Sequence, residues 1–365
     1  MSGWTRFRAS VTDGRLAVVG TLVLLVGGGV IAVRTLDVGR AVDAVVRADR
    51  WLLMLAIGLY AASWPLRGRR FGDVLAAMGE RHGSGYLTAL VFISQTANLA
   101  VPARAGDGLR AYLLKRHRAV RYATGGAALA VERVFDLLAL GVLGGIGLVV
   151  LVAGGRSSLV VGARSTLVVA GGLGVGAVLL AGVTMVLAQA DRRYAPAIRA
   201  WVTRVGLSST TGISRIVTGA LRFGEGVRDV ASRPRRVVAV GGSSVTIWAL
   251  DVATAVAVLA ALVGVTGSGL TPVLLAAAGT LAVSAGNLAK VLPLSQGGVG
   301  LYEAAFAGII AAVTPIPLAV AVAAAVVDHA LKNAVTLVGG GVAATGLNVS
   351  LSSPREEPVD RSSKF

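Results

Sequence analysis

Apolar runs long enough to cross a lipid bilayer recur from one end of this 365-residue chain to the other. The hydrocarbon core of a bilayer is about 30 Å thick, and a helix needs roughly 20 apolar residues to span it. Only 15% of the residues are charged, whereas soluble domains have about 25%. The sequence therefore predicts an all-α, polytopic membrane helical bundle that leaves no room for a large soluble domain.

Six of these runs are predicted to be full spans. The first could instead be a signal peptide, but it is long and no small-residue cleavage site precedes the next polar stretch, so we expect it to be retained. The second is flanked by Trp51 and Trp64, a residue type that favours the membrane interface. The six runs are residues 15–33, 51–66, 122–153, 165–188, 237–264 and 317–346.

Two further apolar segments, residues 84–101 and 271–293, each end at a proline that is followed by glycines and a shorter apolar run. A cluster of cations follows the first segment at residues 115–121, and basic loops are cytoplasmic by the positive-inside rule. The chain must therefore return to the side that it left, which predicts a re-entrant hairpin with its break between Pro102 and Gly108. The linkers on either side of the second hairpin, residues 264–271 and 314–317, carry no charge, which predicts a hairpin that enters from outside.

Counting the spans gives two halves of opposite orientation, each built as helix, helix, hairpin, helix. This is the plan of many secondary transporters; the alternative is that proline and glycine merely kink ordinary spans. We place the protein in the plasma membrane, with both termini and the basic segment 66–82 in the cytoplasm. The predicted divisions are one transmembrane domain at 1–346, inverted halves at about 1–155 and 160–346, a cytoplasmic segment at about 190–236 and a disordered polar tail at 347–365.

Eight ionisable residues fall within the predicted spans and hairpins, where contact with acyl chains would be costly. Glu132 and Asp136 lie four residues apart on one helical face, and Arg133 is three residues from Asp136. Such side chains either form salt bridges that join helices or line a path for a charged head group. The eight are Glu132, Arg133, Asp136, Asp251, Lys290, Glu303, Asp328 and Lys332.

Other classes of function find less support. The net charge of +17 fits cytoplasmic loops and anionic lipid, so we expect no nucleic-acid partner. The chain has no cysteine, and its three histidines lack metal-ligand spacing, so no metal or cofactor is predicted. We expect a transporter-like protein more than an enzyme and assign no catalytic residue. The carboxylates of Glu132, Asp136 and Glu303 leave one rival open, a membrane-embedded transferase that acts on a lipid phosphate.

Three blocks, "PARAGDGLRAYLLKRH", "ALAVERVFDLLAL" and "LPLSQGGVGLYEAA", resemble the lysylphosphatidylglycerol synthase transmembrane family, which is also called flippase-like or uncharacterised family 0104. The resemblance implies translocation or presentation of a phospholipid or lipid-linked sugar, without the synthase catalytic domain. It also implies a possible glycosyltransferase or synthase partner, for which the protein could be a scaffold. The positions that match the family are Arg104, Gly106, Asp107, Arg110, Glu132, Arg133, Asp136, Gly297, Gly298, Gly300 and Glu303.

The ionisable residues within the spans and the family resemblance lead to one predicted mechanism. The two hairpin tips meet near the middle of the membrane, and the head group binds there while its acyl chains stay in lipid. Acidic residues either balance the cations or take up protons, and Asp251, Asp328 and Lys332 form a secondary polar network. The predicted head-group ligands are Arg104, Arg110, Arg133 and Lys290. The pair Ser295 and Gln296 departs from the serine-proline expected in the family, which affects the geometry of the second hairpin.

Overall fold

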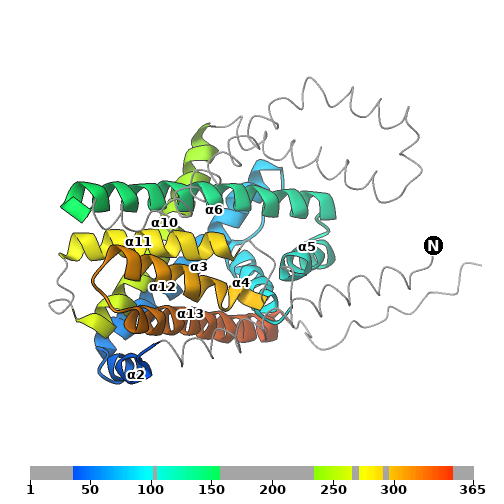
Figure 1. Cartoon of the computed structure of the whole chain (residues 1–365). Coiled ribbons are helices and arrows are strands. Elements are labelled where there is room, and N and C mark those ends of the chain that lie inside the picture. The colour runs from blue at the N-terminus through cyan, green and yellow to red at the C-terminus, as the bar shows by residue number, and fades with distance from the viewer. Residues whose placement is uncertain (1–35, 102–104, 157–233, 265–270, 291–295, 348–365) are drawn as a thin grey trace, which may run out of the picture.

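The computed structural model describes residues 36–101, 105–156, 234–264, 271–290 and 296–347, and these form helices with no strand among them (Figure 1). The predictions for residues 15–33 and 165–188, for Arg104, for the polar tail and for most of the segment 190–236 lie outside this part. The helices are α2 (Val38–Val46), α3 (Arg50–Ala77), α4 (Ser84–Ala100), α5 (Ala105–Arg118), α6 (Tyr122–Leu151), α10 (Pro234–Val263), α11 (Pro272–Ala289), α12 (Leu301–Val313) and α13 (Leu318–Gly346). A π-helical turn, η1 (Val152–Arg156), continues α6, and a short 3₁₀ turn, η3 (Gln296–Gly298), precedes α12.

Four helices in the described ranges are long and apolar enough to cross a membrane: α6 with its continuation to Gly154, α10, α11 and α13. The protein is therefore an all-α polytopic membrane protein, as the sequence predicts. How many segments cross fully stays a prediction, because two of the six expected spans fall outside the described residues.

Helix α3 is longer than the sequence predicts. The expected span ended at Pro65 or Leu66, with a basic loop to residue 82, but the helix continues through Pro65 to Ala77. Proline is tolerated inside membrane helices because neighbouring groups satisfy the freed backbone carbonyl. The loop assignment of Arg67 and Arg70 is thus wrong: both are on the helix, and Arg70 is only 3% exposed.

Both broken segments fold as two helices joined at a break, α4 with α5 and α11 with α12. Glycine lets the two arms of each hairpin approach closely. A Cβ on Gly106 of α5 would collide with the backbone of Ser94 in α4, and one on Gly286 of α11 would collide with the ring of Tyr302 in α12. The helix, break, helix pattern agrees with the predicted hairpins; the side from which each enters stays a prediction.

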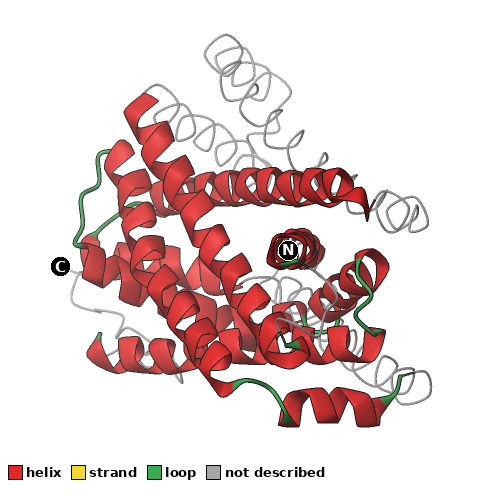
Figure 2. Ribbon diagram, turned by 90° about the vertical axis from the view of Figure 1, so that its left-hand side faces the viewer, coloured by secondary structure: helices red, strands yellow, loops and turns green. Residues whose placement is uncertain are grey.

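The two halves of the chain exchange partners. Helices α3 and α10 pack along each other, α4 of the first half packs against α13 of the second, and α11 of the second half packs against α6 of the first (Figure 1). Figure 2 shows the described residues from a second side, as helices joined by short loops. Each cross-contact is therefore matched by its counterpart in the other half. Two halves related by a pseudo-two-fold axis would produce this pattern, and the division into inverted halves is our interpretation of it.

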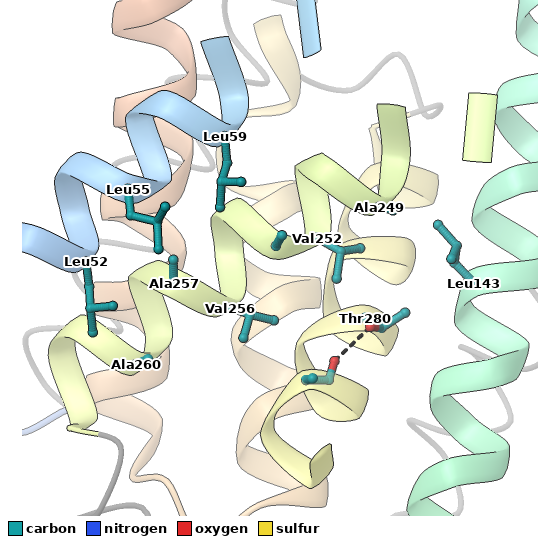
Figure 3. Close-up of a pocket in the computed structure, with 12 residues that line it drawn as sticks. Leu52, Leu55, Leu59, Leu143, Ala249, Val252, Val256, Ala257, Ala260 and Thr280 are labelled. Carbon is teal, nitrogen blue, oxygen red and sulfur yellow. Dashed lines mark hydrogen bonds between the residues drawn. The ribbon is translucent and has the colours of Figure 1, made fainter. Parts of the chain in front are cut away.

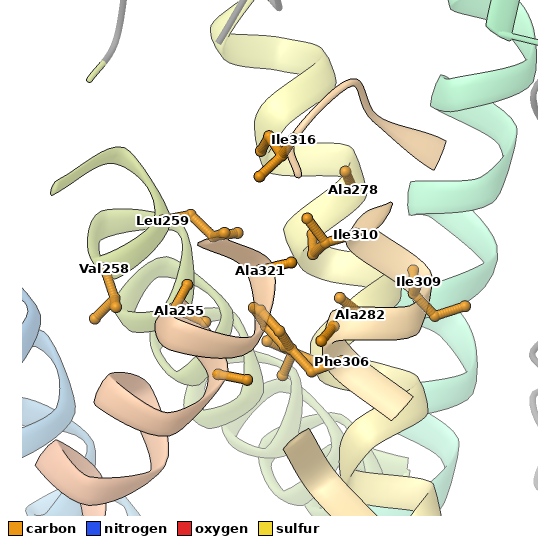
Figure 4. Close-up of a cluster of buried hydrophobic side chains, with 14 of the residues drawn as sticks. Ala255, Val258, Leu259, Ala278, Ala282, Phe306, Ile309, Ile310, Ile316 and Ala321 are labelled. Atoms are coloured by element: carbon orange, nitrogen blue, oxygen red, sulfur yellow. The ribbon is translucent and has the colours of Figure 1, made fainter. Parts of the chain in front are cut away.

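Small residues make both exchanged contacts possible. A Cβ on Gly340 of α13 would collide with Thr96 of α4, and one on Gly147 of α6 would approach the carbonyl of Ala277 in α11. Helices in lipid associate through such close backbone approaches, because lipid tails are as apolar as the side chains and supply no hydrophobic drive. Figure 4 shows the corresponding core of the second half, where Phe306 and Ile310 of α12 pack among alanines of α10, α11 and α13.

Candidate functional site

Buried ion pairs join the helices in two groups. The first network draws on α3, α5 and α6 and consists of three arginines and three carboxylates: Arg70, Asp107, Arg110, Glu132, Arg133 and Asp136. The second network draws on α3, α10, α11, α12 and α13: Arg67, Asp251, Lys290, Tyr302, Glu303, Asp328, His329 and Lys332.

Arg70 is the centre of the first network. Its Nη1 donates to Oδ1 of Asp136 at 2.5 Å and to the hydroxyl of Ser244 at 2.9 Å. Its Nη2 donates to Oε1 of Glu132 at 3.1 Å. The planar guanidinium has its donors in a fixed fork, so one side chain of α3 holds two carboxylates of α6 and a hydroxyl of α10 at once.

Arg110 closes the other side of Glu132. Its Nη1 donates to Oε2 at 2.7 Å, and its guanidinium carbon lies 4.9 Å from the centre of the Phe71 ring. The side chain of Arg110 is 1% exposed and that of Glu132 is 4% exposed. Both oxygens of Glu132 are therefore held by arginines, and neither Arg70 nor Arg110 offers a free face to a ligand.

Arg133 forms the accessible edge of the first network, with 31% of its side chain exposed. It donates to Oδ2 of Asp107 at 3.2 Å and to Oδ2 of Asp136 at 3.3 Å. Asp107 also accepts from the side-chain amide of Asn98 at 3.2 Å and from the hydroxyl of Ser94 at 3.4 Å. Asp107 thus links Arg133 of α6 to both arms of the first hairpin, in addition to the pair of Arg110 and Glu132.

Lys332 is the centre of the second network. Its ammonium donates to Oδ1 of Asp251 at 2.7 Å and lies 3.0 Å from Oδ2 of Asp328. The hydroxyl of Tyr302 donates to the same oxygen of Asp328 at 2.6 Å. The other oxygen of Asp328 is buried without a hydrogen-bond partner in the described part of the chain. The carboxylates of the second network therefore have fewer of their hydrogen-bond acceptors filled than those of the first network.

A glutamate and a histidine face each other beside this centre. Oε1 of Glu303 and Nδ1 of His329 are 2.6 Å apart, and Oε2 of Glu303 accepts from the backbone N–H of Gly300 at 2.7 Å. Glu303 therefore satisfies an otherwise unpaired donor at the start of α12. The pair fixes α12 against α13 at the point where the second hairpin turns.

Lys290 caps α11 and has no carboxylate within ion-pairing distance among the residues that the structure describes. Its ammonium instead lies 4.1 Å from the centre of the Tyr302 ring, a cation–π contact. Gly298 makes this position possible, because a Cβ there would collide with the Lys290 side chain. Lys290 is half-buried, and it differs from Arg67 and Lys332 in having no carboxylate partner among the described residues.

One residue of each half contacts the network of the other. Nη2 of Arg67 in α3 lies 3.7 Å from Oδ2 of Asp251 in α10. Conversely, the indole N–H of Trp248 in α10 donates to Oδ1 of Asp136 in α6 at 2.8 Å. Arg67 stands three residues before Arg70, and Trp248 three residues before Asp251. The two cross-links therefore match each other, and they couple the networks.

The second hairpin tip depends on left-handed glycines. Gly297, Gly298 and Gly300 have φ values of 61°, 77° and 83°, a conformation that a residue with Cβ adopts at a cost. Cδ2 of Leu99, at the end of α4, is 3.3 Å from the place of a Cβ on Gly297. The end of the first inbound arm and the turn of the second hairpin thus lie in contact.

The structure divides the predicted site residues that it describes between the two networks and the turns of the hairpins, with Arg110 and Arg133 in the first network and Lys290 in the second; Arg104 lies outside the described residues. Sequence reasoning missed Arg67, Arg70, Trp248, Tyr302 and His329. For the arginines a signal existed, since a helix continued past Pro65 puts positions 67 and 70 on one face. The described networks contain equal numbers of cations and anions: Arg67, Arg70, Arg110, Arg133, Lys290 and Lys332 against Asp107, Glu132, Asp136, Asp251, Glu303 and Asp328. No cluster of metal-ligating side chains occurs in the described ranges.

Comparisons with known proteins add two findings. Residues 15–340 match the family described as "Lysylphosphatidylglycerol synthase TM region". The chain is also 42% identical, over 364 aligned residues, to the glycosyltransferase AglD of Haloferax volcanii, an alignment that covers 95% of this chain and 57% of the relative. The chain thus spans little more than half the length of that curated protein.

Proposed function

Because the chain belongs to the lysylphosphatidylglycerol synthase transmembrane-region family, we propose that it translocates or presents a phospholipid or lipid-linked sugar across the cell membrane. The observation that carries the proposal is the pair of buried, coupled ion networks at the two hairpins. Charged groups at membrane depth mark substrate pathways by default, and helix breaks at that depth are tolerated where they line a cavity or are buried in protein. We further propose that both termini are cytoplasmic.

Two cations are placed to receive an anionic head group. Arg133 is the most exposed arginine of the first network, and Lys290 has no carboxylate partner in the described ranges. Arg70 and Arg110 are enclosed by carboxylates and act instead as positioning residues that hold Glu132. In this proposal Arg104 is a further ligand, as its position in the matched block suggests.

The similarity to AglD favours a lipid-linked sugar as the transported molecule. That relative is named a glycosyltransferase, which fits a lipid-linked sugar better than an ordinary phospholipid. The same observation supports a second candidate, in which the membrane domain is a scaffold that presents the lipid to a glycosyltransferase or synthase partner. A third candidate is a membrane-embedded transferase, with the hydrogen-bonded pair Glu303 and His329 as its acid and base.

Reconstituted vesicles test the proposal. The purified chain is incorporated into vesicles with a labelled phospholipid or a labelled lipid-linked sugar, and the arrival of label in the opposite leaflet is followed. Arg133→Ala and Glu303→Gln are expected to slow transfer, while Arg47→Ala, whose side chain is 79% exposed on α2, keeps it. Equal rates in the wild type, the variants and empty vesicles would sink the translocase proposal. Formation of a new lipid product from a sugar or aminoacyl donor would favour the transferase.

A further inference from the structure

An apolar groove of about 510 Å³ runs along α10 (Figure 3). Helix α3 supplies one wall, α6 contributes a leucine opposite, and α10 and α11 form the floor between them. Five of the twelve lining residues are alanines, whose short side chains account for the hollow. The lining residues are Leu52, Leu55, Leu59, Leu143, Ala249, Val252, Ala253, Val256, Ala257, Ala260, Ala276 and Thr280.

The lining of the groove offers almost no polar contact. None of the lining residues is charged, and the hydroxyl of Thr280 donates to the carbonyl of Ala276 in its own helix at 2.7 Å. Apolar cavities of this kind do not hold water. In a bilayer the groove is therefore filled by hydrocarbon, either from lipid or from protein.

One end of the groove lies at the same level along α10 as the ion networks. Ala249 and Val252 of the lining flank Trp248 and Asp251 in the sequence of α10, and these two bind Asp136 and Lys332. On the opposite wall, Arg67 follows Leu59 by eight residues of α3, which is about 12 Å along a helix. A molecule that lay in the groove would therefore have one end at the level of the buried charges along α10, and its length would lie among alanines and leucines. That is the distribution of polarity in a lipid.

We propose that this groove holds a hydrocarbon chain of a long-chain lipid, with its head group at the end marked by Trp248 and Asp251. The inference rests on the proposed function and specifies how its cargo binds. The volume lies within the roughly 300–1,000 Å³ of ligand pockets. The groove also opens sideways, since Leu55 is 52% exposed and Ala249 is exposed, so a chain enters from the bilayer without passing through the protein.

Photolabelling of the full chain tests this site. The protein is placed in nanodiscs of phosphatidylcholine and phosphatidylglycerol that contain a phospholipid with a diazirine in its acyl chain. The sites of labelling are then mapped by mass spectrometry. We expect labels to concentrate on residues 249–260 of α10 and 52–59 of α3. Ala253→Trp, which fills the groove, abolishes this labelling, whereas Val338→Trp on a part of α13 that is 69% exposed leaves it unchanged.

A smaller substitution controls for the case in which Ala253→Trp fails to fold. Ala253→Leu fills less of the groove and is expected to reduce labelling without abolishing it, at an unchanged unfolding temperature. Labels spread evenly over all lipid-facing helices, or groove labelling that persists in Ala253→Trp, would overturn the inference. Absence of groove labelling, with α10 cross-linked instead to another segment of the chain or to a second copy, would also overturn it. If groove labelling is specific but vesicles show no translocation, the binding site stands and the proposed transport function fails.

Discussion

If the chain is divided into two inverted halves, as we interpret it, the two ion networks occupy matching places, yet their side chains differ in chemistry. In the first, every carboxylate oxygen accepts from at least one side chain, mostly arginine. In the second, the cations are mainly lysines, a histidine and a tyrosine take part, and one buried oxygen of Asp328 has no partner in the described part of the chain. Matching positions in the two networks thus differ in side-chain chemistry, which indicates different roles.

The chemistry of the side chains indicates what those tasks are. Guanidinium groups stay charged and bind carboxylates through two parallel hydrogen bonds, which favours a fixed brace. An ammonium is a compact charge on a flexible chain, and histidine is the side chain whose protonation most readily changes near neutral pH. We therefore expect the first network to maintain the fold and the second to change during function. Four predictions test this contrast.

The largest loss of stability is expected when a carboxylate of the first network is removed. Asp136→Ala leaves Arg70, Arg133 and Trp248 without an acceptor that each uses. Removing one partner of a buried ion pair costs about 3–5 kcal/mol, and denaturant unfolding in detergent measures the loss. Asp43→Ala is the control, because its pair with Arg47 is exposed and such pairs contribute about 0–1 kcal/mol. Equal losses of unfolding free energy in Asp136→Ala and Asp43→Ala would show that the first network does not stabilise the fold.

A smaller effect is expected in the second network. Tyr302→Phe removes the hydroxyl that donates to Asp328, and a hydrogen bond to a charged group contributes about 1.5–3 kcal/mol. The ring beneath Lys290 is preserved. Tyr112→Phe is the matched control, since its hydroxyl accepts from Arg116 on an exposed surface where water replaces the contact. If both variants unfold at the same denaturant concentration as the wild type, the hydrogen bond from Tyr302 to Asp328 contributes nothing to stability.

The hairpin turns should respond in opposite directions. Gly298→Ala forces a left-handed residue to carry a Cβ and displaces Lys290, for a loss of about 1–2 kcal/mol. Gly108→Ala in the first hairpin meets open space within α5 and is expected to gain about 0.5–1 kcal/mol from helix propensity. Unfolding midpoints of the two variants provide the test. Changes of the same sign would contradict the difference between Gly298, a left-handed turn residue, and Gly108, a residue inside helix α5.

The smallest change in stability is expected at Lys290. Lys290→Met exchanges a cation–π contact of about 0.5–2 kcal/mol for an apolar side chain of similar length, so the free energy of unfolding changes little. Transfer of labelled lipid, however, should fall. Lys115→Met provides the comparison, because its ammonium lies 4.5 Å from the Tyr122 ring in a basic, exposed segment. Equal transfer by both variants would remove Lys290 from the proposed pathway.

Features set by local sequence were predicted closely. The segment 84–101 is helix α4 at Ser84–Ala100, and the run 317–346 is α13 at Leu318–Gly346, because apolar length and helix breakers act within a few residues. The partners of buried charges could not be predicted in this way. The sequence predicts a loop at Arg70 because the span is expected to end at Pro65 or Leu66. No local pattern corrects this, since the acceptors of Arg70, Glu132 and Asp136, stand more than 60 residues away. Tyr302 was missed because neither its hydroxyl nor its ring is marked by a local pattern.

The reversed polarity of the matching pairs also bears on how the chain assembles during synthesis. In the first half the early helix α3 carries the cation Arg70 and α6 the anion Asp136, whereas in the second half α10 carries the anion Asp251 and α13 the cation Lys332. Because the halves share one plan, a nascent α10 could in principle dock in a place meant for α3. It would then bring Asp251 against Asp136, two like charges in a poorly solvating interior. Opposite polarity therefore disfavours an arrangement in which α3 and α10 exchange places, because the exchange would bring like charges together.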